Sequence, residues 1–199
     1  MKKWTEEELE RLRKNFSVAT KKDLLQLFPD RTYQSLIQRA GTGKWGLCLK
    51  KDRSRFINMV HLKMTETEIA YLAGMIDADG TITLLKNSKA TTLKPKLQVS
   101  NTDTRIMDWL MLKIPEGIVN KRKKQPRHKI AYLWRLEGLR ILEILKRLQP
   151  HLIIKINRCG TLISFVERRL EKKIGDKYLK EDYECYEKIK ILNLRGSKD

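Results

Sequence analysis

The chain has 199 residues, of which 41% are hydrophobic and 34% are charged, and its formal net charge is +19 at pH 7. This length is enough for one domain or for two smaller ones, each with a packed core. No stretch approaches the ~18 to 20 consecutive apolar residues of a membrane-spanning helix. The early acidic run Glu6-Glu7-Glu8 also predicts that the first residues are neither a signal peptide nor a transit peptide.

The distribution of charge and cysteine narrows the class of protein further. Residues 1–64 hold 15 Lys and Arg against 7 Asp and Glu, and residues 65–199 hold 28 against 17, so both parts are basic. Such a chain is attracted to polyanions, as nucleic-acid-binding and ribosomal proteins are. Membrane-surface binding is disfavoured because no long stretch pairs an apolar face with a basic one. The three scattered cysteines lack C-x-x-C spacing, which indicates a reduced, intracellular protein without a structural zinc site.

Residues 1–47 are predicted to form a small all-α domain of three helices. Thr5 and Glu8 have the spacing of a capping box, and an apolar stripe with helical spacing follows. A second short helix fits residues 21–28, and a third fits residues 32–40. The polar face of the third helix carries side chains that can contact base edges or phosphate: Arg31, Gln34, Gln38 and Arg39.

This segment resembles the Myb/SANT-like helix-turn-helix domains. The resemblance is carried by the opening Trp4-Thr5-x-Glu7-Glu8, the short middle helix and the polar last helix. It implies DNA binding through Gln34, Gln38 and Arg39, although SANT-type domains often bind proteins, so a protein-binding module or a helical cap remains an alternative. Residues 48–64, with basic side chains up to Arg55, are predicted to be a linker that is either solvated or lies along DNA phosphates.

A second domain, predicted to span residues 65–199, begins with another capping box, Thr65 with Glu68. The helix that follows carries Ala70, Gly74 and Ala78 at every fourth position, so one face has only small side chains and permits close helix–helix approach. Gly80 ends this helix.

The rest of the second domain alternates between strand and helix patterns. Strands are expected at 81–85, 93–100, 118–124 and 130–136, and helices at 103–112, 138–148, 161–173 and 181–194. The order αββαββα predicts an α+β fold, with an antiparallel sheet that has helices on one face. Alternation places these residues on the free face: Thr81, Thr83, Leu85, Lys94, Lys96, Gln98, Asn120, Arg122 and Lys124. Arg127 and Lys129 lie in a basic loop that is expected to grip phosphate. The pattern leaves open which face carries Leu133 and Arg135.

The most specific motif is the run Leu72-Ala73-Gly74-Met75-Ile76-Asp77-Ala78-Asp79-Gly80. It resembles the signature of the LAGLIDADG homing endonucleases, with Met75 at a leucine position. The resemblance implies site-specific double-strand cleavage of DNA with Mg²⁺, bound at Asp79 and Ala78, while Asp77 and Gly80 support the site. It also implies that the antiparallel sheet lies along the major groove, where base edges can be distinguished.

Two further segments resemble the same family. The run Leu148-Gln149-Pro150-His151-Leu152-Ile153-Ile154-Lys155 is similar to the segment in which a lysine approaches the active site, and Lys155 occupies that position. The run Gln98-Val99-Ser100-Asn101-Thr102-Asp103-Thr104-Arg105 matches a strand-to-helix turn that carries an amide and an arginine near the catalytic water. Asn101 and Arg105 hold those positions, and Asn101 is shorter than the usual glutamine.

Only one copy of the signature is present, so the resemblance implies the single-motif branch and a homodimer. Its expected interface residues are Ala70, Ala73, Gly74 and Asp77, and its target should be roughly palindromic. The expected partners are double-stranded DNA and a second copy, with no membrane and no small-molecule substrate, and the expected location is with the target genome. An RNA-splicing maturase, a non-cleaving DNA-binding regulator and a basic structural protein of RNA–protein particles remain alternatives.

Overall fold

The computed structural model describes residues 3–41, 43, 46–52, 60, 62–87, 92–122 and 130–194. Contacts divide the chain into two compact units. The first unit comprises Met1–Ile57 together with Leu170–Lys177, and the second comprises Asn58–Arg169 and Tyr178–Asp199. The short return segment Leu170–Lys177 therefore belongs with residues that lie more than a hundred positions earlier.

The first unit contains the helices α1 (Glu6–Asn15), α2 (Lys21–Leu27) and α3 (Tyr33–Ala40). A threonine precedes each helix, and its side chain accepts the backbone N–H three residues on. The capping box predicted at Thr5 is confirmed. Leu12, Leu24 and Leu36, one from each helix, are fully buried and form the centre of a shared apolar cluster.

Arg31 lies in the interior of this unit and not on the exposed polar face where it was expected. Its guanidinium donates to both carboxylate oxygens of Glu8, at 3.0 and 2.7 Å, and stands 4.3 Å from the centre of the Trp4 ring. The expectation that Arg31 contacts nucleic acid is therefore wrong, because this long-range ion pair occupies its side chain.

The second unit is an α+β fold. Its elements in chain order are α5 (Glu66–Asp79), β1 (Gly80–Lys86), β2 (Leu93–Asn101), α6 (Thr104–Lys113), β3 (Ile118–Lys121), β4 (Tyr132–Glu137), α7 (Leu142–Leu148), α8 (Ile156–Glu171) and α9 (Lys180–Leu192). The four described strands form an antiparallel sheet of order β1-β2-β4-β3, so the predicted α+β class is confirmed. Helix α8 begins at Ile156, earlier than the predicted start at residue 161.

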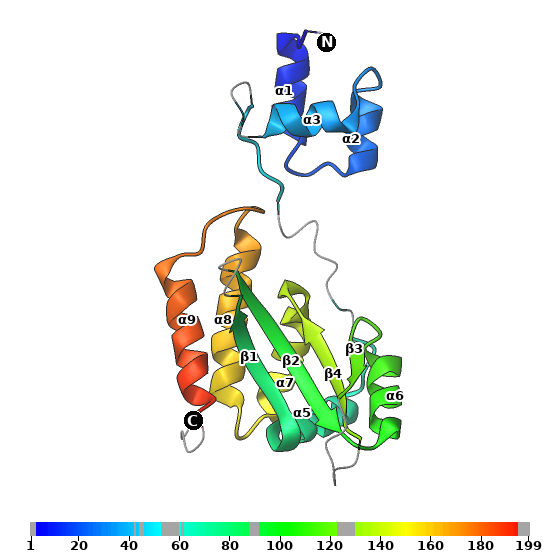
Figure 1. The fold of residues 1–199 in the computed structure, drawn as a ribbon, viewed down its shortest axis with the longest axis vertical. Coiled ribbons are helices and arrows are strands. Elements are labelled where there is room, and N and C mark those ends of the chain that lie inside the picture. Colours follow the sequence, from blue (N-terminus) through cyan, green and yellow to red (C-terminus); the bar gives the residue numbers. More distant parts are fainter. Residues whose placement is uncertain are drawn as a thin grey trace. The chain divides into compact units, whose positions relative to one another are not determined.

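Helices cover one face of this sheet and leave the other open. Seen from behind, α5, α7 and α8 lie over the sheet and α9 stands beside α8 at the β1 edge, whereas the view in Figure 1 shows the uncovered face. The covered face supplies the core, and Ile82, Leu97 and Trp134 there are fully buried. Gly117 allows Trp134 its position, because a Cβ on Gly117 would lie 2.1 Å from the indole nitrogen.

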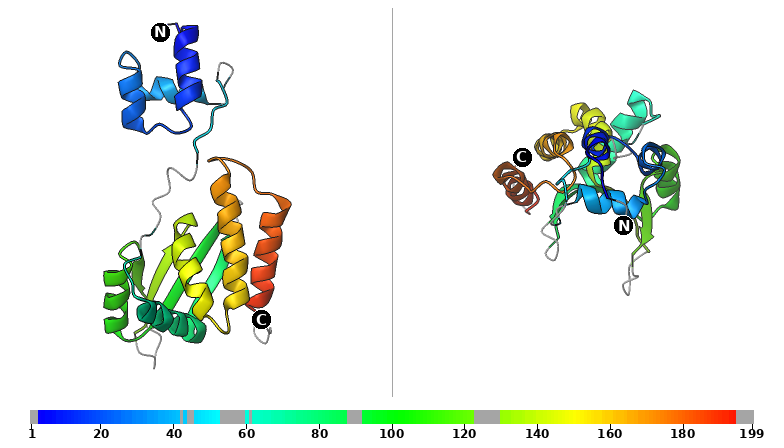
Figure 2. Two further views of the ribbon diagram at one scale, coloured as in Figure 1. Left: turned by 180° about the vertical axis from the view of Figure 1, so that it is seen from behind. Right: turned by 90° about the horizontal axis from the view of Figure 1, so that it is seen from above.

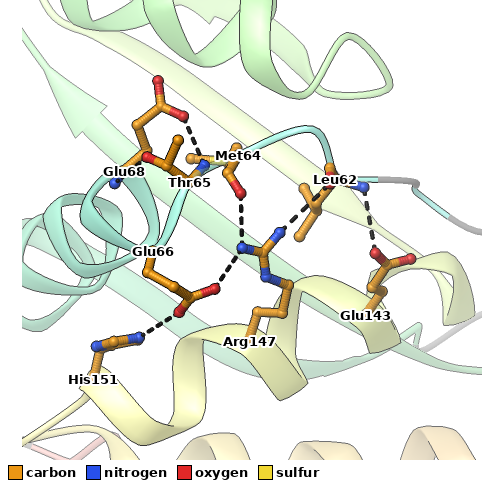
Figure 3. Close-up of polar contacts among 8 residues, drawn as sticks. All are labelled: Leu62, Met64, Thr65, Glu66, Glu68, Glu143, Arg147 and His151. Atoms are coloured by element: carbon orange, nitrogen blue, oxygen red, sulfur yellow. Dashed lines mark hydrogen bonds and ion pairs between the residues drawn. The ribbon is translucent and has the colours of Figure 1, made fainter.

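Residues 62–66, which lead into α5, are bound to α7 and the turn after it by hydrogen bonds and ion pairs of charged side chains (Figure 3). Arg147 donates to the carbonyl oxygen of Met64 at 2.7 Å and to the carboxylate of Glu66 at 2.8 Å, and His151 lies 3.2 Å from the other Glu66 oxygen. Hydrogen bonds from Arg147 and His151 hold the pKa of Glu66 below its ordinary value. The capping box of Thr65 and Glu68 is confirmed in the same view, so the start of α5 is fixed in two ways.

Candidate active site and nucleic-acid interface

The end of α5 and the start of α8 are joined by the side chains of Asp77 and Lys155, each of which bonds to the backbone of the other segment. The Asp77 carboxylate accepts the backbone N–H groups of Ile153, Ile154 and Lys155 at 2.6, 3.1 and 3.0 Å. The Lys155 ammonium donates to the carbonyl oxygens of Ile76 and Asp77, both at 2.6 Å. A negative charge is favourable at a helix N-terminus and a positive charge at a C-terminus, so each residue stabilises the other's helix.

These contacts determine what Asp77 and Lys155 can do. The Asp77 carboxylate is engaged within its own subunit, and its expected place in a dimer interface stays a prediction. Lys155 does lie at the turn that carries Asp79, as expected, but its side chain is buried, with 7% of the residue exposed. Since its ammonium is bonded to backbone carbonyls of this turn, Lys155 positions the turn.

Asp79 is the last residue of α5, and it is exposed. It lines a groove of about 390 Å³ together with Asn101 and the exposed side of α5. Gly80 follows in extended conformation, and a Cβ there would lie 2.5 Å from the Cα of Ile76. Only glycine therefore lets the chain pass from helix to strand directly behind Asp79.

The small-residue face of α5 is open to solvent. Ala70, Gly74 and Ala78 are exposed and line the same groove as Asp79, and a Cβ on Gly74 would meet no atom within 4 Å. Ala73, in contrast, is fully buried in the core of its own subunit. Its predicted interface role is wrong, because it points away from this face.

Asn101 and Arg105 occupy two neighbouring grooves. Asn101 faces the Asp79 groove, and its side-chain oxygen accepts the N–H of Asp103 at 2.9 Å. Arg105 lines a second groove of about 400 Å³, and Tyr71 lines both. The side chain of Arg105 is 89% exposed and pairs with Asp103 at 2.5 Å, which lowers the pKa of Asp103 to about 2. The structure thus brings Asn101, but not Arg105, to the groove of Asp79.

The uncovered sheet face carries the polar residues that alternation predicted. Strand register aligns Thr81 with Gln98 and Thr83 with Lys96. The register of β4, which was left open, places Arg135 opposite Gln98 and Glu137 opposite Lys96. Leu133 shares this face opposite Asn120. Leu85 and Lys94 also pair on this face, Arg122 is exposed just after β3, and Lys124, Arg127 and Lys129 lie outside the described residues.

Glu137 is the one carboxylate within the four described strands, and sequence reasoning missed it. Lys94 donates a hydrogen bond to it, and Arg135 lies 3.8 Å away. Burial alone would raise the pKa of Glu137, but the contact with Lys94 and the charges of Arg135 and Lys96 hold it below its ordinary value. Burial also lowers the pKa of Lys96. The open face therefore carries a net positive charge around one fixed anion.

The other expected sites are seen in part. Gln34 and Gln38 are exposed on α3, and Arg39 is half-buried with its guanidinium 5.8 Å from the Trp4 ring centre. Within the described part of the chain no three His, Cys, Asp or Glu side chains cluster as a metal site. Nor does that part contain a helix long and apolar enough to cross a membrane.

No protein-family model and no curated protein matches the sequence. Among solved structures, the homing endonuclease I-CvuI, in complex with its target in the presence of calcium, is 18% identical with a TM-score of 0.50. The match covers 67% of this chain and 85% of that one. The archaeal intron-encoded homing endonuclease I-Vdi141I, complexed with DNA, is 12% identical with a TM-score of 0.53, over 67% of this chain and 89% of that one. These similarities show that the chain shares the fold of homing endonucleases.

Proposed function

We propose that this protein is a site-specific, homing-type DNA endonuclease that acts as a homodimer with a divalent metal ion. The position of Asp79 carries the proposal. This exposed carboxylate stands at the end of a helix that carries the exposed small residues Ala70, Gly74 and Ala78, and it shares a groove with Asn101 at the end of strand β2.

The residues at Asp79 fit a magnesium ion only in part within one chain. Magnesium commonly binds through one or two carboxylates and takes its other oxygens from water and substrate phosphates. Asp79 and the backbone of Ala78 would hold the ion, and a second copy and the DNA would complete its ligands. When bound, such an ion supplies Lewis acidity to the scissile phosphate and a more acidic water.

The remaining residues would serve this chemistry in separate roles. The side-chain oxygen of Asn101 is occupied by the N–H of Asp103, so its amide NH₂ group is the part that would donate to a water molecule. Lys155 fixes the turn before Asp79 through the carbonyl oxygens of Ile76 and Asp77. Arg105, exposed in the neighbouring groove, would add positive charge close to the DNA.

A homodimer would bring two copies of Asp79 to one seam. Ala70, Gly74 and Ala78 leave room for the same helix of a second copy to approach closely, since no side chain longer than a methyl group stands on this line. A twofold axis along this seam would give one Asp79 for each DNA strand. The target would then be roughly palindromic, because the symmetry of the protein is reflected in its site.

Sequence recognition would come from the uncovered sheet face. Its polar side chains can donate to and accept from base edges in the major groove, and its net positive charge favours the DNA backbone. In the first unit, Gln34, Gln38 and Arg39 of α3 would form a separate contact with DNA of the helix-turn-helix kind. The helices of that unit support this role by leaving Gln34 and Gln38 exposed.

A cleavage experiment on a random-sequence duplex library tests the proposal. We expect discrete double-strand cuts with Mg²⁺, none with EDTA, and near-palindromic symmetry in the recovered sites. Selective binding without cutting would favour a regulator, and binding of structured RNA in preference to duplex DNA would favour a maturase. Either result would contradict the proposed activity.

A further inference from the structure

The first unit contains a small basic cavity that the proposed DNA contacts do not use. Its volume is about 180 Å³, and it is lined by Arg13, Ser17, Cys48, Leu49, Lys50 and Lys173. All six residues belong to the same compact unit. They come from the end of α1, from the segment after α3 and from the return segment Leu170–Lys177.

Backbone hydrogen bonds hold these three segments together. The N–H of Asp52 donates to the carbonyl oxygen of Ser17 at 2.8 Å, and the N–H of Ile174 donates to that of Lys51 at 2.9 Å. Asp52 and Lys173 also form an antiparallel bridge. The three lining cations are therefore brought together by the backbone and do not depend on side-chain contacts alone.

The two lysines in the middle segment have different environments. Lys51 donates to the carbonyl oxygen of Ala19, and its ammonium lies 4.3 Å from the centre of the Phe16 ring. Lys50, its neighbour, lines the cavity. Lys51 is held by Ala19 and Phe16 and does not line the cavity, so Lys50 is the lysine of this pair that is available there.

Among the residues that the structure describes, no carboxylate lines the cavity. Two acids lie near it: Glu6 pairs with Arg13 at 3.2 Å, and Asp176 pairs with Lys50 at 2.5 Å. An ammonium has three donor hydrogens and a guanidinium has five, so Glu6 uses only part of the capacity of Arg13, and Asp176 only part of that of Lys50. The lining then offers Arg, two Lys and a serine hydroxyl, which is the donor set that binds phosphate oxygens.

We infer that this cavity binds a phosphate group of the DNA backbone, so that the first unit anchors DNA independently of α3. The inference rests on the proposed DNA-binding function. The cavity has room for one phosphate group, and its lining offers no arrangement that reads a base. The contact would therefore position the protein on DNA without specifying sequence.

Cys48 provides a direct readout, because it is exposed and lines the cavity. The full-length protein would be alkylated with a small reagent, and modification of each cysteine would be followed by peptide mass spectrometry. We expect a bound duplex to slow modification of Cys48 severalfold while Cys185, which lies on α9 of the second unit, reacts as before. Inorganic phosphate is tested separately. Protection by phosphate but not by bound DNA would overturn the assignment to the DNA backbone.

A matched pair of variants measures how much the charge of Arg13 contributes to DNA binding. Arg13→Gln and Lys14→Gln remove the same charge from adjacent positions of α1. Both residues line another groove of the first unit, but only Arg13 also lines the cavity. Loss of one phosphate contact should reduce the slope of log affinity against log salt by about 0.9 in Arg13→Gln only. Equal slopes in the two variants, or a bound duplex that leaves Cys48 unprotected, would overturn the inference. If the inference is overturned but the duplex is still bound and cut, the proposed endonuclease function stands. If the wild-type protein binds no duplex, both the inference and the proposed function fail.

Discussion

Asp77 and Lys155 are connected twice, because the Asp77 carboxylate accepts the N–H of Lys155 at 3.0 Å while the Lys155 ammonium donates to the Asp77 carbonyl at 2.6 Å. Asp77 lies two residues before Asp79 in α5, and Lys155 lies directly before the first residue of α8. The orientation of Asp79 therefore depends on the contacts between Asp77 and Lys155, and neither of these two residues lines the groove. We call this pair of contacts the clamp.

Asp77→Ala should destabilise the protein, whereas Asp79→Ala should not. The first substitution removes the acceptor of three backbone N–H groups in the turn before α8, and loss of a comparable side-chain acceptor at a helix cap costs about 1 to 2 kcal/mol. The second removes an exposed side chain and should change the free energy of unfolding by less than about 0.5 kcal/mol. Denaturant titration of both variants measures the difference. Equal free energies of unfolding would contradict the role of the clamp.

Gly74→Leu should separate folding from dimerisation. A Cβ on Gly74 meets no atom within 4 Å in the single chain, and leucine has a higher helix propensity than glycine. The variant should therefore fold at least as stably, but it should sediment as a monomer in analytical ultracentrifugation and lose cleavage. A dimer of wild-type affinity would show that the two copies meet elsewhere.

The pH dependence of Asp103 follows from its contact with Arg105. The pKa of Asp103 is about 2 in the folded state, below its usual 3.8. Its ion pair with Arg105 therefore stabilises the fold fully when the pH is above the pKa of the unfolded state. This contribution is lost as the pH falls through about 2. In Arg105→Gln the pKa should rise towards 3.8, as followed by carbon NMR of the carboxyl group. An unchanged titration would show that Arg105 is not the main cause.

Glu137→Gln should strengthen binding to non-specific DNA. The substitution removes the one carboxylate of the four described strands from a face with Lys94, Lys96 and Arg135. One charge close to a phosphate in water is worth ~1 kcal/mol, or roughly fivefold in affinity. Glu167→Gln is the control, because Glu167 on α8 pairs with Lys146 on α7, in the helix layer on the other side of the sheet. Similar gains in the two variants, measured by fluorescence anisotropy, would contradict a specific effect of the sheet face.

Local sequence signals predicted much of this structure. The capping boxes at Thr5 and Thr65 involve residues three positions apart, so they form wherever the helix forms. Period-two alternation placed Thr83 and Lys96 on the same face, because side-chain direction in a strand follows from local geometry. The start of α8 was missed because the turn before it is held by Asp77, a residue distant in sequence.

The incorrect predictions have the same cause. Arg31 was placed on an exposed helix face from its position, but its partner Glu8 lies in another helix. Ala73 and Gly74 are adjacent small residues, and only the packing of the core decides that Ala73 is buried and Gly74 exposed. The return of Leu170–Lys177 to the first unit likewise depends on contacts that no local pattern encodes.

The most direct test of the account compares wild type and Asp79→Asn on the recovered target site with Mg²⁺. Asparagine keeps the shape of the side chain but removes the charge that would hold a metal ion. We predict that the variant folds, dimerises and binds the site as wild type does, but that double-strand cleavage falls to the level seen with EDTA. Cleavage by Asp79→Asn at the wild-type rate would contradict the central claim that Asp79 holds the metal ion at the dimer seam.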